Sequence, residues 1–489
     1  MHEIETFRLL IPLLLPALTA VANVVTGRSP NVRETCSITG AVLTFIAVLG
    51  LLPEVLRGNV YTLHLFQLYE GVNITLRVDG MSLLFAGISS FLWILAGFYC
   101  IGYMRGLHEH AQTRFYACYS ATIFGALGVA FSGTLLTLYL FYEVVSVATY
   151  PLVMHHQDSE AYDGSRKYIT YLMITSKLLL LPAMVLIYIN TGTLDFANNI
   201  THGIFPATAS RTLVTVVYFL SIFGYAKAAL MPFHNWLPSA MVAPTPVSAL
   251  LHAVAVVKVG VFSISRVMLF TFGVNLLQGY NLGIITAYLA SFTILMGSIL
   301  ALTKDNLKAR LAYSTISQLA YIVLGVSLLT DSGITGGLIH IPNHAFSKIT
   351  LFFAAGAILV AHGKKNISDM EGIGYQMPFT MAAFGLASLS MIGVPPVAGF
   401  VSKWYLAVGA MQLQSIGLLV VLLASSLLNA GYFVPIFLTA FFPKNGPAKG
   451  LKYAEASPFM VVPLFITATL SIVVGVYPDL FLKLIEVLK

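Results

Sequence analysis

Residues 226–262 read AKAALMPFHNWLPSAMVAPTPVSALLHAVAVVKVGVF, and this stretch decides how the chain folds. It is apolar enough to lie in a membrane, but prolines interrupt it at Pro232, Pro238, Pro244 and Pro246. Each proline lacks a backbone N–H donor and disturbs an α-helix. Interrupted backbone at membrane depth is tolerated only where it lines protein or a water-filled cavity. The stretch therefore predicts a membrane helix that is broken beside a polar interior.

The rest of the chain has the composition of an integral membrane protein. Of its 489 residues, 58% are hydrophobic and 9% are charged, whereas soluble domains carry about 25% charged residues. Apolar runs of about 20 residues indicate membrane-spanning helices. They predict an all-α polytopic membrane protein of about fourteen transmembrane helices, at residues 7–26, 36–56, 79–104, 115–132, 134–155, 166–190, 211–238, 245–270, 274–303, 309–330, 334–362, 379–410, 414–441 and 459–482.

Several other classes of protein do not fit this sequence. The net charge of +7 comes from loop residues and a few buried ones, so it does not indicate nucleic-acid binding. Cys36, Cys100 and Cys118 form no CxxC pair and no metal-binding spacing. Many apolar runs follow the first one, which therefore does not resemble a cleaved signal peptide. No recognisable site for a nucleotide, flavin or iron–sulfur cluster is present, so we expect no cofactor and no metal in this chain.

The basic residues predict an orientation for these spans. Loops after spans 1, 3, 5, 9, 11 and 13 hold fourteen of them: Arg28, Arg33, Arg105, Arg114, Arg166, Lys167, Lys304, Lys308, Arg310, Lys364, Lys365, Lys444, Lys449 and Lys452. The opposite side holds six: Arg8, Arg57, Arg77, Arg211, Lys483 and Lys489. Because basic loops stay on the cytoplasmic side, we expect both termini outside the cell membrane.

A second interrupted span indicates an internal repeat. Residues 390–406 read SMIGVPPVAGFVSKWYL, with Pro395 and Pro396 at mid-membrane. TSKLLLLPAMVLIY at 175–188 and FSKITLFFAAGAILV at 346–360 also correspond, placing Lys177 opposite Lys348. Both pairs lie five predicted spans apart, which is the pattern of transporters built from inverted repeats.

The repeats, bounded as the family resemblance described below implies, give four segments. We expect three N-terminal helices in residues 1–110, a first inverted repeat of spans 4–8 in 111–272, a second repeat of spans 9–13 in 273–441, and a C-terminal helix in 442–489. The seventh and twelfth helices are discontinuous in this scheme.

Seven charged residues lie inside the predicted spans: Glu143, Lys177, Lys227, Lys258, Arg266, Lys348 and Lys403. We interpret Arg266 as an anchor near a helix end whose side chain snorkels to the interface. One charge at the centre of a span costs about 2.5–3.5 kcal/mol. Six facing lipid would cost roughly 15–20 kcal/mol, more than the about 5–15 kcal/mol by which a typical fold is stable. They must therefore face a protein interior or hydrated cavity, as in a proton path.

Four segments carry a resemblance to a known family. They are residues 226–262, FYEVVSVATYPLV at 141–153, HIPNHAFSKITLFFAAG at 340–356 and GVPPVAGFVSKWYL at 393–406. The chain resembles the antiporter-like subunits of respiratory complex I, of Mrp sodium/proton antiporters and of membrane-bound hydrogenases. Its length and the absence of a long C-terminal lateral helix make it most similar to the D-type Mrp subunit or its hydrogenase counterpart.

The resemblance implies roles for individual residues. Glu143 matches the acid of the fifth helix, and Lys227 matches the lysine that is proposed to pair with it. Lys258 matches the central lysine of the eighth helix, which links the halves. His340, His344 and Lys348 match the eleventh-helix stretch. Lys403 matches the position after the twelfth-helix break.

Other candidates are less directly supported. His340, His344 and Lys348 are spaced at i, i+4 and i+8 and share one helix face, where imidazoles relay protons. His252, His234 and Lys177 are secondary relay candidates. Pro342 departs from the family pattern and puts the local helix in doubt. His155 and His156, which close a span, are interpreted as solvated.

The sequence thus predicts a proton-translocating subunit, with Glu143, Lys227, Lys258, Lys348 and Lys403 as the conducting residues. Expected partners are other membrane subunits, the lipid bilayer and, in a redox complex, peripheral iron–sulfur, hydrogenase or NADH-oxidising subunits. Three alternatives stay open. They are Mrp-type Na+/H+ exchange without a redox partner, an electron-transfer subunit that binds haem or metal through His340 and His344, and a scaffold with vestigial charges. Whether the chain is part of a redox enzyme is also open.

Overall fold

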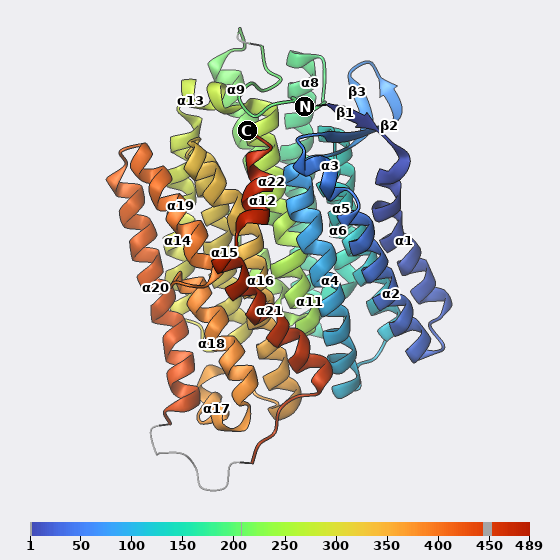
Figure 1. Ribbon diagram of the computed structural model, residues 1–489, viewed down its shortest axis with the longest axis vertical. Coiled ribbons are helices and arrows are strands. Elements are labelled where there is room, and N and C mark those ends of the chain that lie inside the picture. Colours follow the sequence, from blue (N-terminus) through green and yellow to red (C-terminus); the bar gives the residue numbers. More distant parts are fainter. Residues whose placement is uncertain (1, 207, 444–451) are drawn as a thin grey trace.

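The computed structural model describes residues 2–206, 208–443 and 452–489. Long helices run side by side along the vertical axis of Figure 1, and both termini lie near the same end. A small sheet of β-strands lies at that end too. Of the basic residues used to predict orientation, Lys444 and Lys449 lie outside the described residues.

The N-terminal part contains the sheet and the first long helices. In chain order it consists of β1 Glu3–Glu5, η1 Phe7–Leu9, α1 Leu10–Val25, α2 Pro30–Leu49, α3 Leu52–Leu56, β2 Val60–Tyr69, β3 Val72–Val78 and α4 Gly80–Gly106. β1 pairs with β2 in parallel, with Glu3 opposite Val60, and β2 pairs with β3 antiparallel. The all-α prediction overlooked these strands, although residues 60–69 are rich in the aromatic and β-branched types that strands favour.

The middle of the chain contains short and interrupted helices. Its elements are α5 Gln112–Ala130, α6 Leu135–Val153, α7 Ser159–Thr175, η2 Ser176–Leu180, α8 Leu181–Thr191, α9 Arg211–Gly224, η3 Ala226–Ala228, α10 Trp236–Ser239, η4 Ala240–Val242, α11 Thr245–Ala249, η5 Leu250–Val254, α12 Val256–Val267 and η6 Met268–Phe272. Three of them, η2, η5 and η6, are π-helical turns. Such turns inside α-helices occur frequently at functional sites.

The remaining elements include the longest helix. They are α13 Val274–Gly279, α14 Leu282–Leu302, α15 Leu307–Ser327, α16 Asp331–His362, η7 Ile367–Met370, α17 Ile373–Gln376, α18 Pro378–Ile392, α19 Ala398–Gln412, α20 Ile416–Phe441, α21 Pro458–Val476 and α22 Asp479–Glu486. Pro342 does not break α16, contrary to the doubt raised from the sequence. Residues 333–358 of this helix are all buried, so packing on every side offsets the backbone bond that proline removes.

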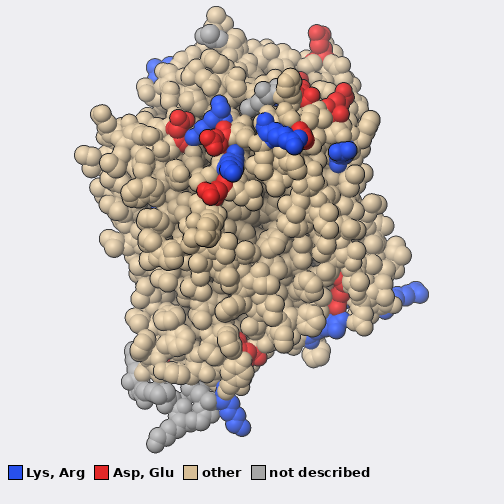
Figure 2. All heavy atoms as spheres, viewed as in Figure 1, with Lys and Arg blue, Asp and Glu red and all other residues tan. Residues whose placement is uncertain are grey.

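Within the described residues, ten helices are long and apolar enough to cross a membrane. α9 and α18 are apolar but shorter, because the chain breaks after each of them. α5 and α15 have 19 and 21 residues but are less apolar than most of the others. On the face shown in Figure 2, charged side chains gather toward the two ends and leave an uncharged band between them. The chain is a multi-pass membrane protein, while the count of fourteen spans stays a prediction.

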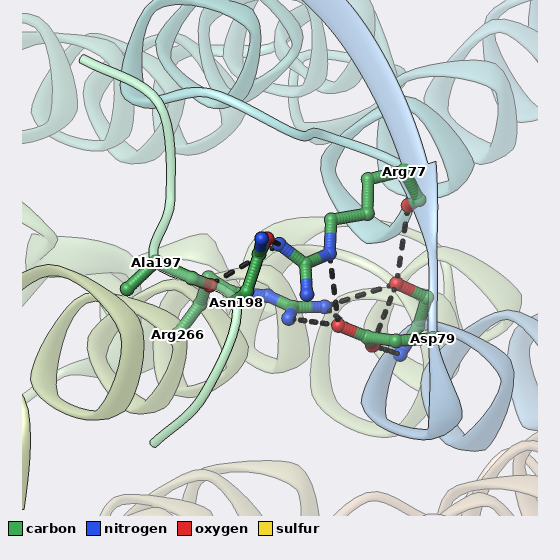
Figure 3. A network of polar contacts seen from close by, with 6 residues as sticks. Arg77, Asp79, Ala197, Asn198 and Arg266 are labelled. Carbon is green, nitrogen blue, oxygen red and sulfur yellow. Dashed lines mark hydrogen bonds and ion pairs between the residues drawn. The ribbon is translucent and has the colours of Figure 1, made fainter. Parts of the chain in front are cut away.

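Arg266 is not a snorkelling anchor. Its side chain is 1% exposed, and its two terminal nitrogens donate to Asp79 at 2.5 and 2.9 Å. Arg77 lies beside Arg266 and approaches the same carboxylate oxygen, with its Nε 3.7 Å from Asp79 Oδ2 (Figure 3). Every residue of α11–η6 around Arg266 is buried, so the side chain has no route to the interface. Because this charge is buried, it requires a counter-charge inside the protein.

Asp79 joins three parts of the fold at one point. It caps α4 by accepting from the backbone N–H of Ser82 at 3.0 Å. Arg266 brings in α12, and Arg77 extends the network by donating to the Ala197 carbonyl and to Asn198, each at 3.1 Å (Figure 3). The carboxylate therefore fixes the start of α4 against α12 and against the loop that follows α8.

We predict that Asp79→Ala destabilises the protein strongly. Removing one partner of a buried ion pair leaves an uncompensated charge and typically costs about 3–5 kcal/mol. The thermal unfolding midpoint of the purified protein in mild detergent measures the loss. Glu54→Ala is the control, because Glu54 pairs with Arg57 at the surface, where a pair contributes about 0–1 kcal/mol. Equal midpoints for the two variants would contradict the role given to Asp79.

Candidate functional site

The break after α9 brings Lys227 into the protein interior. α9 ends at Gly224, and the chain continues through the short turn η3 to Ala229, which has a left-handed φ of 54°. Trp236 Nε1 donates to the Ala226 carbonyl at 3.0 Å, which satisfies one acceptor freed by the break. Lys227 itself is completely buried. The interrupted backbone predicted from the prolines is therefore present, and it carries a buried lysine.

α6 supplies the partners of Lys227. The Lys227 Nζ donates to the Tyr142 carbonyl at 2.8 Å and to Ser146 Oγ at 2.7 Å, and it lies 3.1 Å from the centre of the Tyr142 ring. The backbone N–H of Lys227 also donates to the Tyr142 hydroxyl at 3.1 Å. These contacts replace the hydration that the ammonium loses on burial.

Glu143 does not pair with Lys227, which corrects the expectation from the sequence. Its Oε2 lies 3.1 Å from the Nζ of Lys177, and Lys177 also donates to the Tyr139 hydroxyl at 2.7 Å. Neighbouring residues of a helix point about 100° apart, so Tyr142 faces Lys227 while Glu143 faces the π-helical turn η2. The other oxygen of Glu143 is buried and has no hydrogen-bond partner among the described residues.

Lys258 and His344 join the two halves of the chain. The Nζ of Lys258 on α12 contacts the Nδ1 of His344 on α16, and both side chains are 1% exposed. The ring of His344 lies 5.9 Å from that of His340, one helical turn away. The expected link between halves is thus made by direct contact between a lysine and a histidine.

His340 has a partner at each ring nitrogen. Its Nδ1 lies 2.7 Å from Ser402 Oγ, and its Nε2 lies 3.0 Å from Gln318 Oε1. Ser402 is on α19, next in sequence to Lys403. The histidine therefore bridges α15 and α19, and neither nitrogen is left free for a metal.

A chain of hydrogen bonds connects Lys348 to Lys403. Lys348 Nζ donates to Ser314 Oγ at 2.9 Å, and the Tyr432 hydroxyl donates to the same oxygen at 3.0 Å. Asn429 Oδ1 lies 2.5 Å from the Tyr432 hydroxyl, and Asn429 Nδ2 donates to the Met391 carbonyl at 3.1 Å. Lys403 Nζ donates to that same carbonyl at 3.0 Å. Ser314, Tyr432 and Asn429 were not predicted from the sequence, because single hydroxyl and amide residues in apolar helices carry no distinctive pattern.

The break between α18 and α19 holds Lys403. Its Nζ donates to the Ile392 carbonyl at 2.7 Å as well as to Met391, and to Ser426 Oγ at 3.0 Å. Both carbonyls are freed because α18 ends at Ile392 and Gly393 turns the chain with a φ of 93°. The carbonyls freed at this break therefore hold Lys403 directly.

His252 is buried between these groups, whereas His234 lies apart from them. His252 lies in the π-helical turn η5 and packs against the tilted ring of Phe352, with ring centres 4.7 Å apart. Both of its ring nitrogens lack a hydrogen-bond partner among the described residues, and it interacts electrostatically with Lys348 and Lys258. His234 is partly exposed, and its Nδ1 lies 3.3 Å from the carbonyl of Pro232 in its own loop.

A cavity of about 440 Å³ opens at the end of the molecule opposite the termini. Charged residues from both halves line it: Asp158, Glu160, Lys308, Lys364 and Lys365. Tyr103 reaches it from α4, and its hydroxyl accepts from the backbone N–H of Thr245 at 3.3 Å. Thr245 begins α11, which leads directly into η5 and His252. The cavity therefore lies next to the beginning of the buried segment that contains His252.

Comparison with known proteins agrees with this arrangement. The family described as NADH:quinone oxidoreductase/Mrp antiporter matches residues 132–429. This range begins just before α6 and ends at Asn429, and it includes Glu143, Lys227, Lys258, Lys348 and Lys403. The N subunit of the NADH-quinone oxidoreductase of Desulforudis audaxviator is 32% identical over 408 residues, or 80% of this chain and 79% of that protein.

Antiporter subunits are similar to the chain over part of their length. A probable K(+)/H(+) antiporter component of the A/B type, from Rhizobium meliloti, is 32% identical over 90% of this chain. The A-type component of the Na(+)/H(+) antiporter of Alkalihalophilus pseudofirmus is 32% identical over 84% of it. The chain spans about half the length of these two relatives, 44% and 53% respectively.

Two solved structures have the same fold. One belongs to the Mrp complex of a Dietzia species, with a TM-score of 0.84 and 22% identity. The other belongs to a membrane-bound sulfane sulfur reductase, described as an archaeal respiratory membrane complex, with a TM-score of 0.86 and 26% identity. Each comparison covers 98% of this chain and 96% of the other. The chain therefore belongs to the NADH:quinone oxidoreductase/Mrp antiporter family of multi-pass membrane subunits.

Proposed function

We propose that this chain conducts protons across the membrane as one component of a larger membrane complex. The observation that carries the proposal is the run of polar contacts through the middle of the protein. Lys258 contacts His344, and a hydrogen-bonded chain joins Lys348, one turn farther along α16, to Lys403. Ionisable groups inside a membrane protein are typically found along ion pathways and proton relays.

The types of side chain suit protons better than a larger ion. Hydroxyl groups, imidazoles and neutral amines both accept and donate hydrogen bonds, so a proton passes between Lys348, Ser314 and Tyr432 by exchange of bonds. The Asn429 amide and the Met391 carbonyl hold Lys403 in position and do not themselves carry the proton. Each link between Lys348 and Lys403 is a direct side-chain or carbonyl contact of 3.1 Å or less. Such contacts leave no room for a hydrated metal cation between the groups.

Glu143 acts as a switch in this proposal. A carboxylate beside an ammonium stabilises both charges, and separation of the two favours their neutral forms. Glu143 pairs with Lys177 and interacts electrostatically with Lys227 across α6. Movement of the carboxylate from Lys177 toward Lys227 changes which lysine retains its proton. The half-exposed Lys177 is therefore a control point, and the buried Lys227 begins the conducting path.

The proposal also covers the number of membrane crossings and the internal repeats. We infer fourteen crossings and two inverted repeats, because each predicted repeat contains one broken helix with a lysine held beside the break. The charged cavity serves as the access route from the basic end, which the distribution of lysine and arginine assigns to the cytoplasm. His252, which lies beyond Thr245, then delivers protons toward Lys258 and Lys348.

Other membrane subunits are the proposed partners. Lys177 has a side chain that is 49% exposed, and it lies on a face with exposed apolar residues such as Leu178 and Val147. A half-exposed lysine in such a face is costly against lipid, so a neighbouring protein is the better cover. The two solved structures compared with this chain are both membrane complexes.

Specific observations and one experiment distinguish the proposed function from its rivals. Relatives named as Na(+)/H(+) or K(+)/H(+) antiporter subunits favour cation exchange as the second candidate. Haem or metal ligation by His340 and His344 is disfavoured, because both nitrogens of His340 are bound to Ser402 and Gln318. Mass spectrometry of the intact complex distinguishes an antiporter from a redox pump by whether iron–sulfur, nickel–iron or flavin subunits accompany the chain.

Tyr432→Phe is expected to slow proton transport about tenfold, which corresponds to an increase of ~1.4 kcal/mol in the activation barrier. The change removes the hydroxyl that joins Ser314 to Asn429 and leaves the ring in place. Proton uptake into inverted membrane vesicles, followed with a pH-sensitive dye, measures the rate. Tyr119→Phe is the matched control, because Tyr119 is buried and its hydroxyl has no partner among the described residues. Equal rates for both variants would remove Tyr432 from the path.

Glu143→Gln is expected to reduce the rate of transport more than tenfold, which corresponds to an increase of more than ~1.4 kcal/mol in the activation barrier. Lys177→Gln is expected to have a smaller effect, about two- to tenfold, since one hydrogen bond or ion pair contributes ~0.5–1.5 kcal/mol. The same vesicle assay measures both. Lys489→Gln serves as control, because Lys489 pairs with the exposed Asp331 at the surface. If Lys177→Gln behaves like the control, Lys177 has no part in switching.

A further inference from the structure

The loop between α4 and α5 meets the turn between α6 and α7 at a cluster of histidines around one carboxylate. Glu109 Oε2 lies 3.4 Å from His155 Nε2 and 3.7 Å from His156 Nδ1. His110 packs against His155 with ring centres 4.8 Å apart. One ligand atom from each of Glu109, His110 and His155 falls within 4.8 Å of the others. The cluster lies at the end of the molecule with the charged cavity, outside the buried path.

His155 is the unusual member of this cluster. The sequence predicted a solvated side chain, but the residue is 0% exposed. Neither ring nitrogen has a hydrogen-bond partner in the described part of the chain, although Nε2 points at the Glu109 carboxylate. A buried polar group without a hydrogen bond is unfavourable and calls for a ligand. Because Nε2 lies 3.4 Å from Glu109 Oε2, Nδ1 is the ring nitrogen that has no partner at all in the described part of the chain.

The spacing fits a tetrahedral metal ion. Zn²⁺ binds histidine nitrogen at about 2.0–2.1 Å and carboxylate oxygen at about 2.0–2.2 Å, so two ligand atoms of one ion lie about 3.3–3.5 Å apart. The Glu109–His155 distance is 3.4 Å, and the Glu109–His156 distance is 3.7 Å. One carboxylate with two or three imidazoles is a set of ligands that zinc takes in proteins.

The two loops are held in place by contacts outside the cluster. Gln112 Nε2 donates to the Glu109 carbonyl at 3.1 Å, and Arg33 donates to Gln112 at 2.7 Å. Arg114 donates to the His155 carbonyl at 3.0 Å. Asp158 caps α7 by accepting from the Ala161 N–H at 2.7 Å. Ligands on fixed loops lose little conformational freedom on binding, which favours affinity.

We propose that Glu109, His110 and His155 form a binding site for a divalent transition-metal ion of the Zn²⁺ type, with His156 beside it. The ion ties the α4–α5 loop to the α6–α7 turn. The sequence predicted no metal site, because the two loops lie some forty residues apart and neither has a recognised ligand spacing. His156 also lines the charged cavity, so a bound ion restrains the mouth of that cavity.

Metal binding to the purified complex tests the site without any transport measurement. The complex is stripped with a chelator, titrated with Co²⁺ as an optical probe, and then competed with Zn²⁺. We expect one tetrahedral Co²⁺ per copy of this chain, displaced by Zn²⁺. Glu109→Gln and His155→Asn should each weaken binding at least about 100-fold, because loss of even an outer-shell partner weakens metal affinity about 10–100-fold.

His108→Asn is the matched control for these variants. His108 is exposed and lies in the same loop, one residue from Glu109, but it contributes no atom to the cluster. This variant should bind Co²⁺ as the unchanged protein does. If His155→Asn fails to assemble, His110→Asn takes its place, since His110 belongs to the cluster and is exposed. Equal affinity in Glu109→Gln and His108→Asn would overturn the proposal and leave an ordinary ion pair between Glu109 and the histidines.

Hydrogen exchange of the backbone tests the tie between the loops. Zn²⁺ should slow exchange in residues 107–112 and 154–158 together, and this protection should be absent in Glu109→Gln. Slowing in only one of the two segments would overturn a site shared between them. The further expectation that Zn²⁺ slows ion uptake rests on the proposed function, whereas binding and exchange do not depend on it. Failure of the site and failure of the function are therefore distinguishable.

Discussion

A charged side chain buried at membrane depth must be surrounded by polar groups, and the backbone is the only abundant source of them. An unbroken helix offers few, because every carbonyl in its interior already accepts one hydrogen bond and has only its second lone pair left. The breaks after α9 and α18 remove this limitation. Lys403 takes two carbonyls that α18 frees at its end, and Lys227, released from helical geometry, reaches the Tyr142 carbonyl of α6. The helix breaks and the buried lysines therefore depend on one another.

Close packing keeps these charges away from lipid. Gly260 of α12 lies so near the break that an added Cβ would be 2.1 Å from the Ala228 nitrogen, and such a contact between backbones tolerates glycine alone. At the end of the protein that carries the termini, the Asp79 carboxylate fixes α4 and α12 through Arg266. α12 thus carries Lys258 between two rigid attachments, which holds the contact with His344 in register.

The sequence predicted the features that follow from local pattern. Prolines inside apolar runs located both breaks, and lysines inside such runs located the principal buried charges. Predictions that depend on the direction in which a side chain points were wrong, and some contacts of this kind were missed. The partner of Glu143 was misassigned because adjacent residues on α6 face different helices. Arg266 was misassigned because its counter-charge is 187 residues away, and Tyr432 was missed because a tyrosine in an apolar helix has no distinctive neighbours.

The proposed path contains many cations and one carboxylate, and this imbalance has a mechanistic consequence. Two unit charges about 10 Å apart in surroundings of effective dielectric constant about 20 repel by ~1.7 kcal/mol, which alters an equilibrium more than tenfold. Protonation of one lysine in the row therefore disfavours protonation of the next. Glu143 relieves this repulsion only for the lysine that it approaches. A displacement of the carboxylate between Lys177 and Lys227 would then propagate along the row as a sequence of proton shifts, without large movements of the helices.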